Sequence, residues 1–98
     1  MVEKVIWTLK AELSFERVLS FLKEDWSARV ADGFAGVVQS KIELLRSYPM
    51  AGFASGRKKG YRRILLSKHN SLFYRIKDDS IVILNIHDNR QDLKRIAK

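Results

Sequence analysis

Cationic and aromatic side chains alternate in the C-terminal half of the sequence. Tyr61–Arg63 is followed by Phe73–Arg75, and His87 and Arg90 come at the end of the last apolar run. Arginines with interleaved aromatic rings can bind single-stranded RNA, because the guanidinium contacts phosphate and the ring stacks on a base. Aromatic rings are also common in strands for packing alone. Both interpretations of these rings stay open.

The net charge of +8 arises in one part of the chain. Residues 1–56 hold seven Lys/Arg and seven Asp/Glu, whereas residues 57–98 hold twelve and four. Such asymmetry indicates a surface that meets a polyanion or an acidic protein, although a solvated charged rim would give the same pattern. The residues expected to bind the target or polyanion are Arg57, Lys58, Lys59, Arg62, Arg63, Arg75 and Arg90.

His87 is the residue best suited to proton transfer, since a histidine titrates near neutral pH. A histidine beside an aspartate, here Asp88, is more often structural than catalytic, and both interpretations stay open. The chain has two histidines, no cysteine and no HxH or HExxH spacing, so no metal site is expected. It also lacks a glycine-rich phosphate loop, a GxSxG motif and a paired-carboxylate site. We therefore expect no cofactor and no small-molecule substrate.

The apolar periodicities predict an α+β fold with the order β-α-α-β-β-β. Thr8 and Ser27 can cap the two helices, and Pro49 should end the second one. The helical hairpin should pack on one face of a small, mostly antiparallel sheet. Residues 49–60 are expected to form a loop. The strands are predicted at 2–8, 61–67, 72–77 and 80–87, the helices at 9–26 and 28–48, and a short helical tail within 90–98.

Four finer expectations follow from the same patterns. The stripe Phe15, Leu19, Leu22 and Trp26 should bury one face of the first helix. Gly33 and Gly36 should allow another backbone to approach the second helix. Residues 81–86 should form a central strand buried on both faces. Arg62 and Arg63 should point to opposite faces of the sheet, since side chains alternate along a strand.

The length and hydropathy bound the organisation of the protein. Ninety-eight residues fit a single domain spanning 1–98. No apolar run reaches the ~18 residues of a membrane span, and the N-terminus has no signal-peptide core. We therefore expect a cytoplasmic protein without a membrane partner.

The order and spacing of several loose motifs suggest a family. They are Trp7-Thr8 with Glu12, Leu44–Pro49, Gly60–Leu65, Leu72–Ile76 and Ile83–Asp92. Over nearly its full length the sequence resembles the RelE/ParE superfamily of type II toxins, the plasmid-stabilisation type. The resemblance implies a protein that inhibits growth unless a cognate antitoxin covers it.

Two mechanisms occur in this superfamily. RelE-like members cut mRNA in the ribosomal A site without a metal, and ParE-like members poison DNA gyrase. If this chain were RelE-like, the resemblance implies that Arg62, Arg90 and His87 form the catalytic set. Arg62 stands where a nuclease lysine is expected, and Arg90 or Gln91 where an arginine follows the last strand.

Other positions depart from the nuclease pattern. Ile64 and Ser71 replace a second lysine and an arginine, and Leu93–Lys98 holds no tyrosine or histidine. The departures favour a ParE-like inhibitor of gyrase over an RNA-binding endoribonuclease. A third alternative is an inactive relative that only binds its antitoxin and represses their operon.

Overall fold

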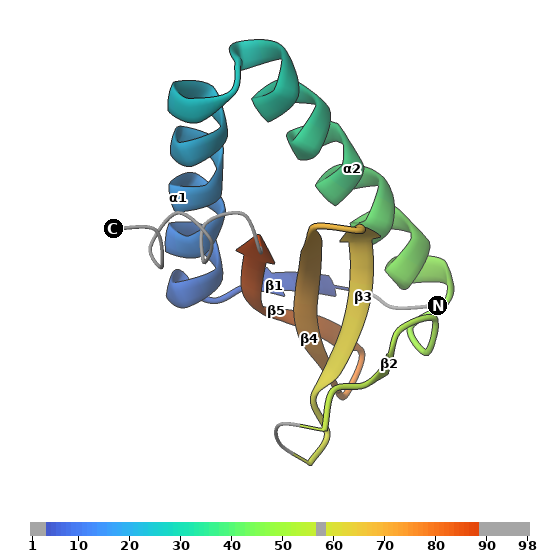
Figure 1. Cartoon of the computed structure of the whole chain (residues 1–98). Coiled ribbons are helices and arrows are strands. Elements are labelled where there is room, and N and C mark those ends of the chain that lie inside the picture. The colour runs from blue at the N-terminus through green and yellow to red at the C-terminus, as the bar shows by residue number, and fades with distance from the viewer. Residues whose placement is uncertain (1–3, 57–58, 89–98) are drawn as a thin grey trace.

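The computed structural model describes residues 4–56 and 59–88 and confirms the predicted α+β class (Figure 1). Two helices cover one face of a five-stranded mixed sheet with the order β1-β5-β4-β3-β2. β1 pairs parallel to β5, and all other pairs are antiparallel. The predicted tail helix within 90–98 lies outside the described residues. The elements are β1 (Lys4–Trp7), α1 (Leu9–Asp25), α2 (Ala28–Ser47), β2 (Phe53–Ala54), β3 (Arg62–Ser67), β4 (Asn70–Lys77) and β5 (Ser80–Asp88).

Both predicted helix caps are present. The Thr8 hydroxyl accepts a hydrogen bond from the Ala11 amide and donates one to the Ile83 carbonyl, which fixes the start of α1 to β5. The Ser27 hydroxyl accepts from the Val30 amide and starts α2. Each cap stabilises the fold by about 1 kcal/mol. The helices therefore follow one another almost directly and diverge from their connection (Figure 1).

The end of α2 is set by Pro49. Tyr48, the residue before it, has left the helical region at φ −131° and ψ 75°. A proline ring clashes with helical geometry in the preceding residue, so the predicted helix end is confirmed.

The core lies between the helices and the sheet, and α1 packs mainly on β5. The central strand is β4, whose residues Leu72, Phe73 and Tyr74 are all buried. Residues 81–86 form an interior strand as expected, because β5 lies between β1 and β4. Their expected burial on both faces is wrong, since Val82 and Leu84 are only half-buried. The expected burial of Trp26 is also wrong: it is 57% exposed because it caps the C-terminus of α1, beyond the face that packs. The buried apolar residues of the cluster are Ala11, Val18, Leu22, Ala31, Phe34, Val38, Ile42, Leu45, Ile64, Leu66, Leu72, Tyr74, Ile81, Ile83 and Ile86.

An irregularity interrupts the pairing of β4 with β5. Phe73 faces Asn85 while the next residue, Tyr74, faces Ile83, so β5 holds one extra residue at this point. Just beyond the irregularity, the Ile86 amide donates to the buried hydroxyl of Ser14 on α1 at 3.0 Å. A bulge of this kind leaves ladder groups to be satisfied elsewhere, and here a helix side chain supplies a partner.

Turns and loops agree with the sequence in part. Lys68-His69 and Asp78-Asp79 form two-residue turns, and Asp78 adopts a positive φ of 53° that aspartate tolerates. Part of the predicted loop 49–60 forms a strand. Phe53 and Ala54 form β2 and pair with β3, because the loop folds back along the edge of the sheet.

Close backbone approach occurs at a glycine other than the two predicted. A Cβ added to Gly33 or Gly36 would meet no described atom within 4 Å, so that expectation is wrong. At Gly52, by contrast, a Cβ would lie 2.6 Å from the Tyr74 hydroxyl and 2.7 Å from the Arg63 carbonyl oxygen. Only glycine fits where this loop crosses the sheet.

These contacts predict opposite effects for two glycine-to-alanine changes. Gly52→Ala should lower the free energy of unfolding by about 1–3 kcal/mol through overpacking against backbone. Gly36→Ala should raise it by about 0.5–1 kcal/mol, since alanine restricts the unfolded chain and fits a helix. Urea denaturation of both variants measures the difference. Equal effects would contradict the close contact at Gly52.

Candidate functional site

The strand register divides the candidate residues between the two faces of the sheet. Arg62 pairs with Tyr74, which is buried beneath the helices. Arg63 pairs with Phe73, which pairs in turn with Asn85, and this row lies on the face opposite the helices, which we call the open face. The prediction that Arg62 and Arg63 point to opposite faces is confirmed.

Arg62 is engaged within the molecule. Its Nη2 donates to the carbonyl oxygens of Met50 at 3.2 Å and Gly52 at 2.5 Å. Its buried Nε has no hydrogen-bond partner among the described residues. A guanidinium that already donates hydrogen bonds to two loop carbonyls has fewer donors left for a phosphate. Arg62 therefore has a structural role in holding this loop.

Tyr74 holds the same loop from beneath the sheet. Its side chain is fully buried, and its hydroxyl donates to the Pro49 carbonyl at 2.7 Å and accepts from the Gly52 amide at 3.0 Å. We call residues 48–54 the tethered loop. Of the two interpretations of this ring, stacking on a base and packing in the sheet, its full burial supports packing. Its role in holding the loop could not be predicted, because nothing in the sequence shows that a tyrosine on a strand lies close to the glycine-containing loop.

Arg63 and Arg75 are the cations that the open face brings together. The Arg63 guanidinium lies over the Phe53 ring, 4.8 Å from its centroid, which is cation–π geometry. Arg75 is two residues along β4 from Phe73, the partner of Arg63, so the two arginines are diagonal neighbours at roughly 7–8 Å. Lys59 is exposed in the loop before β3. Arg57, Lys58 and Arg90 lie outside the described residues.

The two candidate catalytic residues that the structure describes, Arg62 and His87, lie on opposite faces of the sheet. His87 pairs with Ser71, which pairs with Leu65, on the face opposite Arg62. Strand spacing places it about 12 Å from Arg63 in Cα separation, two strands across and two residues along. Proton transfer requires groups within about 3 Å of the reacting atom. Among the described residues, Arg62 and His87 therefore cannot act on one phosphate from the same side.

A polar chain holds the end of β5 beside His87. The buried Asn70 donates from Nδ2 to Asp88 Oδ2 at 3.2 Å and accepts at Oδ1 from the Ser67 hydroxyl at 3.0 Å. Asp88 is fully buried. The arrangement fits the structural alternative for Asp88, because its carboxylate is engaged with the β3–β4 turn.

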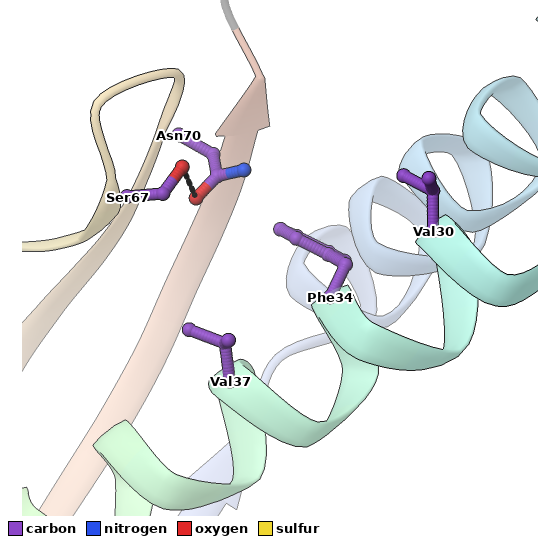
Figure 2. Close-up of a pocket in the computed structure, with 5 residues that line it drawn as sticks. All are labelled: Val30, Phe34, Val37, Ser67 and Asn70. Atoms are coloured by element: carbon purple, nitrogen blue, oxygen red, sulfur yellow. Dashed lines mark hydrogen bonds between the residues drawn. The ribbon is translucent and has the colours of Figure 1, made fainter. Parts of the chain in front are cut away.

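A small groove opens between this turn and α2 (Figure 2). Val30, Phe34 and Val37 point from α2 toward Ser67 and Asn70 at the ends of β3 and β4. Its volume is about 180 Å³, enough for one or two apolar side chains. An apolar wall with a polar rim suits a side chain of a protein partner better than a nucleotide.

Two further features bear on the kinds of ligand. Within residues 4–56 and 59–88, no group of three or more His, Cys, Asp or Glu side chains could hold a metal ion. No helix in the same residues has the length and hydropathy needed to cross a membrane.

Comparison with known proteins identifies the family. The model for the ParE toxin of type II toxin–antitoxin system, parDE, matches residues 5–97. The chain belongs to this family of toxins, within the RelE/ParE superfamily. No curated protein matches the sequence.

Solved structures share the fold at low sequence identity. A chain of the chromosomal ParDE TA system from P. aeruginosa aligns with a TM-score of 0.76 at 21% identity, over 89% of this chain and 96% of that one. A YoeB/ParE toxin from Agrobacterium tumefaciens aligns at 0.63 and 17%, over 88% and 98%. A chain of the E. coli DinJ-YafQ toxin-antitoxin complex aligns at 0.63 and 10%, over 93% and 97%.

The hydrogen bonds of the Tyr74 hydroxyl should contribute to the free energy of unfolding. Tyr74→Phe removes the hydroxyl and leaves the Pro49 carbonyl and the Gly52 amide without their partner, so the free energy of unfolding should fall by about 1–3 kcal/mol. Tyr48→Phe is the matched control, because Tyr48 is exposed and its change should stay within about 0.5 kcal/mol. Thermal and urea unfolding measure both. Equal losses would show that the hydroxyl does not hold the loop.

Proposed function

We propose that this ParE-family toxin arrests growth by binding a protein target, DNA gyrase, and does not cleave RNA. The observation that carries the proposal is the engagement of Arg62 with the carbonyls of Met50 and Gly52. RNA cleavage needs free cations at the scissile phosphate and a group that transfers a proton, each contributing several kcal/mol. The open face instead offers Arg63 and Arg75 as a fixed cationic surface.

The target- and polyanion-binding residues follow from this proposal. Arg63 and Arg75 contact the target directly from the open face, and Lys59 extends the cationic surface toward the edge of the sheet. Arg57, Lys58 and Arg90, which belong to the same basic part of the sequence, add to its long-range attraction for an acidic surface. Arg62 acts indirectly, by holding the tethered loop.

A cognate antitoxin silences the toxin in this proposal. The groove in Figure 2 is suited to an apolar anchor residue from an antitoxin helix or strand. Carboxylates on the same antitoxin segment would neutralise the basic face. One solved relative comes from a TA system and another from a toxin-antitoxin complex, which supports this assignment.

Activity assays separate the mechanisms. Induced expression of the chain should arrest growth, and expression of its cognate antitoxin should restore it. The purified protein should inhibit supercoiling by gyrase and leave mRNA on programmed ribosomes intact. Cleaved mRNA with normal supercoiling would establish the RelE-like alternative, and normal growth with abundant folded protein would establish an inactive relative.

Charge reversal on the open face tests the proposed surface. Arg63→Glu with Arg75→Glu should abolish growth arrest while circular dichroism remains native, since both side chains are half-buried and lie outside the buried apolar cluster. Lys10→Glu with Lys23→Glu on α1 is the matched control and should keep the toxin active. If the helix pair detoxifies as strongly as the strand pair, net charge and not this face determines activity.

A further inference from the structure

The tethered loop presents apolar side chains to solvent. Tyr48 and Met50 are 66% and 65% exposed, and Leu44, one helical turn before Tyr48, is also exposed. Residues Ser47 to Ala51 line a shallow hollow of about 550 Å³ at this position. We call Leu44, Tyr48 and Met50 the loop patch. Contiguous exposed apolar residues often mark a binding surface.

The loop patch is held in place by buried groups. The Ala51 amide donates to the Tyr48 carbonyl at 2.9 Å, which closes a turn with Pro49 at its second position. The Tyr74 hydroxyl and the Arg62 guanidinium fix the carbonyls of Pro49, Met50 and Gly52. A loop that is fixed through its backbone and exposes apolar side chains loses little entropy on binding. This rigidity is what a docking surface needs.

The chain that carries the loop patch is rich in cationic residues, although the acidic Glu43 precedes Leu44 on α2. The sequence holds no Asp or Glu between Glu43 and Asp78. Arg62 lies against the loop through the Met50 carbonyl, and Arg46 is exposed in the last turn of α2. An apolar surface with a cationic surround is complementary to a segment with both apolar and acidic side chains. The nine Lys/Arg in the acid-free stretch are Arg46, Arg57, Lys58, Lys59, Arg62, Arg63, Lys68, Arg75 and Lys77.

We propose that the loop patch is a docking site for an acidic, apolar segment of a protein. Apolar side chains of that segment cover Tyr48 and Met50, and its carboxylates lie beside the exposed Arg46. The segment belongs to the toxin's protein target. In this respect the docking site rests on the proposed function. The site is separate from the groove of Figure 2, which α2 forms nearer its N-terminus with the β3–β4 turn.

A peptide of defined composition tests the proposal whether or not the protein arrests growth. The probe is a fluorescein-labelled amphipathic peptide of leucine, phenylalanine and glutamate, measured by anisotropy against the full chain. It should bind with an affinity that falls as salt rises, because screening weakens the charge contacts. In ¹H–¹⁵N spectra, the amides of residues 44–54 should shift. A peptide with lysine in place of glutamate should bind at least about tenfold more weakly, or about 1.4 kcal/mol.

Variants assign the binding to the loop patch. Met50→Glu should weaken the peptide at least about tenfold, or about 1.4 kcal/mol. Leu9→Glu is the matched control, since Leu9 is 70% exposed in the first turn of α1, where an acid is tolerated, and it should bind the peptide as the wild type does. Tyr74→Phe, which keeps every side chain of the patch, should also weaken binding because the loop is released.

Four results would overturn the proposal: no peptide binding, equal losses for Met50→Glu and Leu9→Glu, shifts confined to the open face around Arg63, or displacement of the peptide by oligothymidylate. Dimerisation of the free chain through the patch, detected by sedimentation and abolished by Met50→Glu, would assign the patch to self-association instead. Growth arrest is scored separately. A toxin that fails to arrest growth but binds the peptide through residues 44–54 contradicts the proposed function and leaves the docking site standing.

Discussion

The buried hydroxyl of Tyr74 is the interaction on which the arrangement of the β2 side of the molecule depends. It lies on the central strand, and a buried hydroxyl without partners would cost about 1–3 kcal/mol. The Pro49 carbonyl and the Gly52 amide satisfy it, which brings the chain after α2 down onto the sheet. From there Phe53 and Ala54 can pair with β3. One side chain thus joins the end of the helical layer to the edge of the sheet.

The same constraint determines how the cations are used. Because the tethered loop crosses the sheet beside Arg62, this guanidinium binds loop carbonyls, and Arg63 on the opposite face packs on Phe53 from the same loop. Two adjacent arginines therefore differ in role through strand alternation alone. The ParE-family fold with the adjacent Arg62 and Arg63 is in this way compatible with a surface that binds a protein, and the described residues hold no assembled nuclease centre.

The sequence predicted those features that depend on local chemistry. Thr8, Ser27 and Pro49 set the helix ends through capping and proline geometry, and the strand meander followed from apolar runs and turn residues. What the sequence left open or predicted wrongly depended on contacts between distant segments. The parallel addition of β1, the exposure of Trp26 and the approach at Gly52 are decided by which elements pack together. The roles of Tyr74 and Arg62 were missed for this reason, since a 22-residue separation between Tyr74 and Gly52 leaves no periodic signal.

Hydrogen exchange at the Gly52 amide tests the central claim most directly, because this amide donates to the buried Tyr74 hydroxyl in a segment that otherwise resembles a surface loop. A loop amide without a buried partner exchanges through local motions of nearly zero free energy, whereas a core amide exchanges only through large-scale opening. The account predicts that Gly52 is protected to about the same degree as the amides of β4. Exchange of Gly52 at the rate of an open loop, with β4 still protected, would contradict it.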